Sequence, residues 1–97
     1  MNRRGTLHKH LEDTRTELQR LRAQLRVLDE QMSYVADVAQ EAETRALVSG
    51  TPLADRDSRA AAEDLRRTRR EHDELGQRIA ALMAEQDSLL DRLTATS

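Results

Sequence analysis

The sequence has no cysteine, no tryptophan and no phenylalanine, and its 97 residues include one tyrosine, one proline and three glycines. The absence of cysteine excludes disulfides, thiolate zinc sites, iron–sulfur clusters and cysteine nucleophiles. No apolar run approaches the roughly 18 residues of a membrane span. The basic start Met-Asn-Arg-Arg is followed by no apolar segment, so a secretory signal is not expected. We expect a cytoplasmic protein with no contact to membranes.

Charged residues make up 35% of the chain and hydrophobic residues 37%. Both values depart from those of ordinary soluble domains, where charged residues are about 25% and apolar residues about 45–50%. The 16 basic and 18 acidic side chains nearly balance, which gives a net charge of −2. Much of the chain therefore faces water, and its core must be small.

The residues that break helices are concentrated in one stretch at mid-chain, Ser49-Gly50-Thr51-Pro52. Gly50 suits the left-handed position after a helix, Thr51 suits a helix cap, and Pro52 suits a first helical position. We expect one hairpin over residues 1–97. Its first helix covers about residues 6–48, its tip residues 49–51, and its second helix about residues 52–94.

Apolar residues on both segments recur at alternating steps of three and four, which is the repeat of a coiled coil. The stripe on the first segment is Leu7, Leu11, Thr14, Leu18, Leu21, Leu25, Leu28, Met32, Val35, Ala39, Ala42 and Ala46. The stripe on the second is Ser58, Ala61, Leu65, Thr68, His72, Leu75, Ile79, Leu82, Gln86, Leu89 and Leu93. The pattern predicts an all-α fold, a long antiparallel two-helix coiled-coil hairpin, two copies of which can form a four-helix bundle.

The two stripes can be paired so that the sum of facing residue numbers stays nearly constant, as a hairpin requires. This register begins with Ala46 opposite Ser58, passes through Met32 opposite His72 and ends with Leu11 opposite Leu93. Residues 27–50 carry five acids and one base, and we expect them to face the arginine run at residues 66–70. Stripe residues near the tip are small, and those near the open end are large.

Two polar residues of the second stripe, His72 and Gln86, are interpreted as core positions that fix the register. Metal or ligand binding by His72 is the less favoured alternative, and His8 and His10 point to different sides of a helix. The arginine run is interpreted as a solvated flank, because acids surround it and aromatic residues for stacking on bases are missing. We expect no catalytic residues, no metal, no cofactor and no direct binding of nucleic acid.

Apolar residues outside the stripes form two rows. Val27 and Tyr34, with Val38 nearby, share an outer face of the first helix, and Met83 and Leu90 share a flank of the second. A two-helix hairpin is a single layer, so docking on another helix or on its own copy buries more apolar surface. These five residues are the predicted partner-binding positions, and a homodimer is one expected use of them.

The tip carries two acids, Asp55 and Asp57, near the start of the second helix. The segment Asp55-Arg56-Asp57-Ser58-Arg59-Ala60 on a hairpin resembles the coiled-coil arm of the Gre and DksA class of factors that enter the secondary channel of RNA polymerase. That resemblance implies an acidic tip acting inside the polymerase. The alternative is that both acids only complement the helix N-terminus. The zinc cysteines and second domain of those families have no counterpart here.

The composition, rich in arginine and alanine, is also similar to that of small helical-hairpin regulators of actinobacteria, some of which hold sigma factors. Ser33-Tyr34 and Gln40 resemble positions in the cyclic-di-GMP-binding members, although the Arg and Asp of that motif are not at the matching places. We carry over no function from either resemblance. The sequence predicts a non-enzymatic interaction module, a small bacterial regulator that acts by binding a protein partner or itself. The alternative is a transcription factor that binds RNA polymerase or a sigma factor and inserts its acidic tip into the secondary channel of the polymerase.

Overall fold

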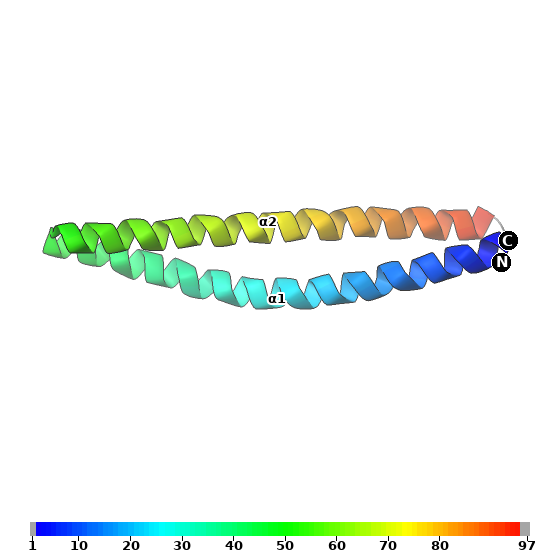
Figure 1. Cartoon of the computed structure of the whole chain (residues 1–97), viewed down its shortest axis with the longest axis horizontal. Helices are drawn as coiled ribbons and strands as arrows, with labels where there is room; N and C mark the ends of the chain where they lie inside the picture. The colour runs from blue at the N-terminus through cyan, green and yellow to red at the C-terminus, as the bar shows by residue number, and fades with distance from the viewer. Residues whose placement is uncertain (1, 96–97) are drawn as a thin grey trace. The chain divides into compact units, whose positions relative to one another are not determined.

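The structure, a computed structural model, describes residues 2–95 and is an all-α helical hairpin, which confirms the fold class predicted from the sequence (Figure 1). Helix α1 is Arg3–Ser49 and helix α2 is Pro52–Ala95. Helix α1 begins three residues before the expected start because Asn2 caps it. The Gly5 N–H donates to Asn2 Oδ1 at 2.6 Å, which satisfies one of the free donors of a first helical turn.

Only Gly50 and Thr51 separate the two helices. Gly50 has a φ of 62°, the left-handed conformation that suits glycine, and its N–H donates to the Ala46 carbonyl at 3.0 Å. Thr51 Oγ1 accepts a hydrogen bond from the Ala54 N–H at 3.2 Å and so caps α2. Pro52 is the first residue of α2, where its missing N–H costs nothing.

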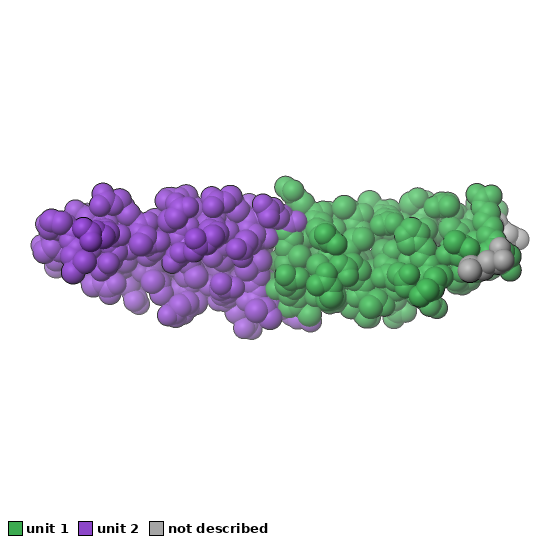
Figure 2. All heavy atoms as spheres, in the orientation of Figure 1, with its two compact units in different colours: residues 1–25, 75–97 green, residues 26–74 purple. Residues whose placement is uncertain are grey.

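The chain divides into two compact units, which are coloured separately in Figure 2. Unit 1 is Met1–Leu25 with Leu75–Ser97, and unit 2 is Arg26–Glu74. Each unit therefore contains a segment of both helices, and the turn lies in unit 2. No helix in the described residues has a stretch apolar enough to cross a membrane.

Unit 1 contains two clusters of large aliphatic side chains. The first contains Leu7, Leu89 and Leu93 with Leu11 packed against it. The second contains Leu18, Leu21 and Ile79, with Leu25, Leu75 and Leu82 packed against it. Each cluster joins α1 to α2, so it is the burial of leucine and isoleucine that holds these two helical segments together.

These clusters correct the expected register. The expected pairing gives Leu7 no partner, yet Leu7 is buried in one cluster with Leu89 and Leu93. If the register is shifted by one stripe position from the expected one, every residue of both clusters has a partner on the other helix. The pairs are then Leu7 with Leu93, Leu11 with Leu89, Leu18 with Leu82, Leu21 with Ile79, and Leu25 with Leu75. The turn is shorter than the expected pairing requires, because only two residues lie outside the helices.

Unit 2 has a smaller core. Its buried hydrophobic residues are Leu28, Ala42 and Ala61, and Thr68 is buried with them. The remaining predicted stripe positions of this unit are half-buried, and so is Ala54, which lies outside the predicted stripe. The small side chains expected near the tip therefore form the core between α1 and α2 there.

Two buried threonines interrupt the apolar stripe, one in each unit. Thr14 Oγ1 donates to the His10 carbonyl at 2.9 Å, and Thr68 Oγ1 donates to the Asp64 carbonyl at 2.8 Å. Each bond runs to the carbonyl one turn earlier on the same helix. Both hydroxyls are satisfied locally, so neither residue leaves an unpaired polar group in the core.

Candidate partner-binding surface

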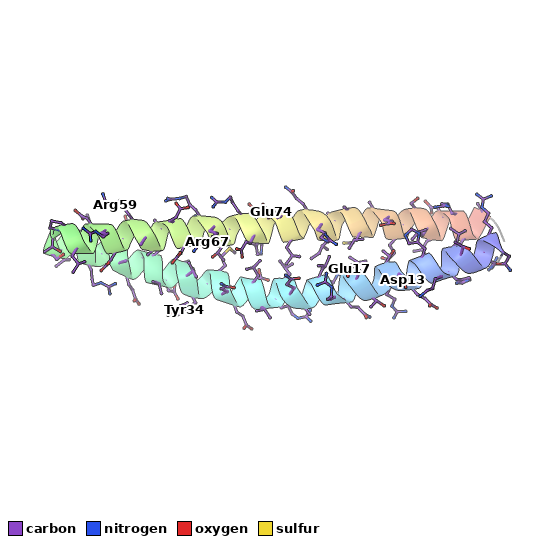
Figure 3. All side chains as sticks on the ribbon, viewed as in Figure 1. Asp13, Glu17, Tyr34, Arg59, Arg67 and Glu74 are labelled. Carbon is purple, nitrogen blue, oxygen red and sulfur yellow. The ribbon has the colours of Figure 1, made fainter. Side chains whose placement is uncertain are left out.

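The predicted residues Val27 and Tyr34 lie on one outer face of unit 2, and Val48 shares that face. Val27, Tyr34 and Val48 are seven and fourteen residues apart and therefore share a face of the helix. Tyr34 is 70% exposed, Val48 is 83% exposed, and Val27 is exposed as well. The Tyr34 side chain points away from α2 (Figure 3). Val38, one turn after Tyr34, is half-buried. Together the four residues make an apolar row, which we call the α1 strip.

Carboxylates flank the α1 strip and also interrupt it, because Glu41 stands seven residues after Tyr34 and seven before Val48. Glu30, Asp37 and Glu41 are exposed and lie within one turn of the apolar residues. None of the three has a basic group within 4.0 Å among the described residues, so their charge is available to another molecule. Two exposed bases, Arg26 and Arg45, also lie within one turn of these apolar residues.

The turn adds exposed apolar side chains that the sequence interpretation missed. Leu47 is 81% exposed, and Leu53 is exposed just after the turn. Val48, Leu53 and Ala54 line an open hollow whose other walls are Thr44, Arg45, Ser49, Thr51 and Asp57. The missed signal was two large aliphatic residues outside the stripe and next to a turn, where nothing in the hairpin can cover them.

The predicted tip acids differ in their local setting. Asp55 stands in the first turn of α2, where a carboxylate complements the positive end of the helix dipole, and its N–H donates to the Thr51 carbonyl at 3.1 Å. Asp57 lines the apolar hollow at the turn. The two carboxylates therefore do not act as one equivalent pair.

The predicted row on α2 belongs to unit 1. Met83 is 45% exposed and Leu90 is 46% exposed, less than Val27, Tyr34 and Val48 of the α1 strip. Gly76, one heptad before Met83, has no atom within 4 Å of the place where a Cβ would stand. The row is therefore open and nearly uncharged, with Asp87 as the charged residue within one turn of both Met83 and Leu90.

The polar stripe residue His72 contacts α1 at a carboxylate. Its Nε2 lies 2.6 Å from Asp29 Oδ1, and its Nδ1 lies 4.0 Å from Asp73 Oδ1. The ring remains half-buried on the stripe, as does Gln86 in unit 1. A second histidine makes a similar contact in unit 1, where His10 Nε2 lies 2.8 Å from Glu85 Oε1. The sequence interpretation assigned His10 to a frayed end, whereas it pairs across the hairpin.

The arginine run pairs along its own helix. Arg66 contacts Glu63 at 2.7 Å and Arg67 contacts Asp64, each three residues earlier on α2. The hydrogen bond from Arg66 holds the pKa of Glu63 below its ordinary value. The expected pairing of this run with the acidic half of α1 is not observed. For that reason, the carboxylates next to the apolar residues of the α1 strip form no ion pairs with these arginines.

One arginine bridges the helices in unit 1. Arg78 Nη2 lies 3.4 Å from Glu17 Oε1, and Arg20 contacts the same carboxylate at 2.6 Å. The hydrogen bond from Arg20 is the main reason that the pKa of Glu17 lies below its ordinary value, and Arg78 adds to it. These contacts are exposed, so their contribution to stability is small.

Among the described residues, no cluster of three or more histidine, aspartate or glutamate side chains is placed to hold a metal. An open groove lies between the two helical segments of unit 2. The residues that line this groove include the small residues Ala36, Ala39 and Ala62, Glu43 on α1, and Arg59, Arg66 and Arg69 on α2. No family model, no curated protein and no solved structure matches this chain.

Proposed function

We propose that the chain is a non-enzymatic helical-hairpin module that binds a protein partner. The observation that carries this proposal is the α1 strip, an apolar row in unit 2 whose Val27, Tyr34 and Val48 the hairpin leaves exposed. Single exposed apolar residues are ordinary, but a row at heptad spacing is the pattern that a second helix covers. The row on α2 of unit 1, with Met83 and Leu90, suits association with a second copy because it carries little charge.

The test is a capture experiment with tagged protein in a lysate of its own cells. The variant Tyr34→Asp with Val38→Asp places charge on the contact, which costs binding when the surface is desolvated. The matched control is Glu12→Gln with Asp13→Asn, two exposed substitutions in unit 1. We expect the wild type and the control to retain the same partner and the strip variant to lose it. Retention by all three contradicts the proposal.

A second candidate function, transcription regulation through RNA polymerase or a sigma factor, rests on the acidic tip. Asp57 beside exposed Leu53 gives that tip a mixed acidic and apolar surface. The variant Asp55→Asn with Asp57→Asn separates the two functions. If the tip enters an enzyme's channel, the variant loses its effect on that enzyme while the partner still binds; if the α1 strip is the working surface, the variant behaves as the wild type. We expect the second result, because Asp55 already has a structural reason at the helix N-terminus.

A further inference from the structure

The α1 strip continues into the hollow at the turn, and both belong to unit 2. A second open hollow on α1 is lined by Asp37, Gln40, Glu41, Thr44 and Arg45. It shares Thr44 and Arg45 with the hollow at the turn. Val48 and Leu53 line the hollow at the turn, and Val27 and Tyr34 precede Val48 on the same face of α1, with the exposed Glu41 between Tyr34 and Val48.

The charge of this surface has one dominant sign. Glu30, Asp37, Glu41 and Asp57 are acidic, and the exposed bases within one turn of the α1 strip are Arg26 and Arg45. None of these four acids forms an ion pair with another described residue, whereas the acids on the flank of α2, Glu63 and Asp64, are paired with arginines. Glu41 lies in the row itself, seven residues from both Tyr34 and Val48, and the other carboxylates lie beside the row. A surface on which exposed apolar side chains alternate with unpaired carboxylates matches a ligand that offers apolar and basic side chains together.

The length of the surface matches a helix. Val27 and Val48 are three heptads apart, and at about 1.5 Å per residue their separation along α1 is roughly 32 Å. A partner helix of about 20 residues covers that length. Apolar side chains of such a helix reach the row at steps of three and four residues, and the basic residues beside them reach the carboxylates.

We propose that the α1 strip and the hollow at the turn bind one basic amphipathic helix of a protein partner. Its apolar residues pack on Val27, Tyr34 and Val48, and its lysines and arginines pair with Glu30, Asp37 and Glu41. The proposal rests on the protein-binding function and adds the chemistry of the partner. Two copies of the strip facing each other place carboxylates against carboxylates, which disfavours a dimer through this surface. The acidic edges disfavour anionic lipid surfaces and nucleic acids for the same reason.

The chain provides its own reporter for this surface. Tyr34 is the only aromatic residue, so tyrosine emission reports the centre of the α1 strip directly. The probe is a synthetic 21-residue peptide, (LKKLLKK)3, which has no tyrosine and forms an amphipathic helix with leucines on one face. The control probe is (LEELLEE)3, with the same leucines and the opposite charge. Both are titrated into the full chain by fluorescence anisotropy of Tyr34 and by calorimetry.

Two variants with equal changes in charge make the test specific. Glu30→Gln, Asp37→Asn and Glu41→Gln remove three charges in or beside the strip, and Glu12→Gln, Asp13→Asn and Asp91→Asn remove three exposed charges in unit 1. We expect the basic peptide to bind the wild type and the unit 1 variant alike, and the strip variant about tenfold or more weakly at low salt. We expect no binding of the acidic peptide.

Four results overturn the assignment. Equal losses in the two triple variants mean that the peptide senses only net charge. Equal binding of both peptides means that charge plays no part. A wild type that forms dimers strengthened by the strip variant means that a second copy occupies the surface. An unchanged Tyr34 signal with the basic peptide removes the basic helix as the ligand, while the capture experiment with the Tyr34→Asp, Val38→Asp variant still decides whether the strip binds a protein.

Discussion

Unit 1 and unit 2 are made from the same two helices, yet they use their apolar residues in opposite ways. Unit 1 buries leucine and isoleucine in two clusters, and its exposed large hydrophobic residues are Met83 and Leu90. Unit 2 buries Leu28 and two alanines and exposes Val27, Tyr34, Leu47, Val48 and Leu53. The contrast indicates that unit 1 supplies most of the stability and that unit 2 supplies the surface for binding.

The largest expected effect is on the core of unit 1. Leu18 is 1% exposed, so Leu18→Ala removes buried side-chain volume and leaves a cavity. We expect a loss of about 2–5 kcal/mol in the free energy of unfolding, measured by urea denaturation. The matched variant in unit 2 is Leu65→Ala, whose side chain is only half-buried. Losses of the same size in both variants break the comparison.

A smaller effect is expected on self-association through unit 1. Met83→Glu with Leu90→Glu adds charge to the row on α2, and we expect it to weaken any dimer by at least about tenfold. Sedimentation equilibrium across micromolar concentrations measures the dimer of the wild type and of this variant. A single species of 11.1 kDa at every wild-type concentration removes the homodimer and leaves an external partner for the exposed rows.

A change that strengthens the weak core sharpens the comparison further. His72→Leu replaces a half-buried ring on the stripe of unit 2 with an apolar side chain, and it removes an exposed contact to Asp29. Burial of a leucine is worth about 1.5–3 kcal/mol and a hydrogen bond of this kind about 0.5–1.5 kcal/mol, so we expect a net gain near 1 kcal/mol. A lower melting temperature means that the pair of His72 and Asp29 matters more than the apolar stripe at this position.

The smallest expected effect concerns acid pH in unit 1. The pKa of Glu17 is lowered in the folded state, so its ionised form stabilises the hairpin at pH values above the ordinary 4.5. This contribution is lost as the pH falls through the lowered pKa. Glu17→Gln should therefore melt slightly below the wild type at pH 7, and the difference should vanish at strongly acid pH. A difference that persists in acid means that Glu17 acts through packing and not through its charge.

The sequence predicts the fold class because the heptad stripe is long and the breakers are concentrated at one turn. Every predicted stripe position is buried or half-buried, and Gly50 and Thr51 take the conformations that their residue types favour. The register was wrong by one stripe position because the repeat itself permits either pairing. The length of the turn decides between them, and the sequence alone left that length at three residues.

Contacts at the flanks of the stripe were harder to predict. Whether Arg66 pairs along α2 or across to α1 depends on side-chain geometry that the repeat does not contain. The contact of His72 with Asp29 was missed for the same reason, because it depends on the register. Leu47 and Leu53 were missed because they belong to no heptad row and become conspicuous only when their exposure is known.

The most direct test of the central claim is amide hydrogen exchange measured residue by residue on the full chain. Amides in the leucine clusters of unit 1, at residues 14–25 and 75–89, should exchange slowest because they open only when the hairpin unfolds. Amides at residues 35–65 should exchange faster, because the core beneath them is small. Uniform protection along both helices, or slower exchange in unit 2, contradicts the division between a unit that stabilises and a unit that binds.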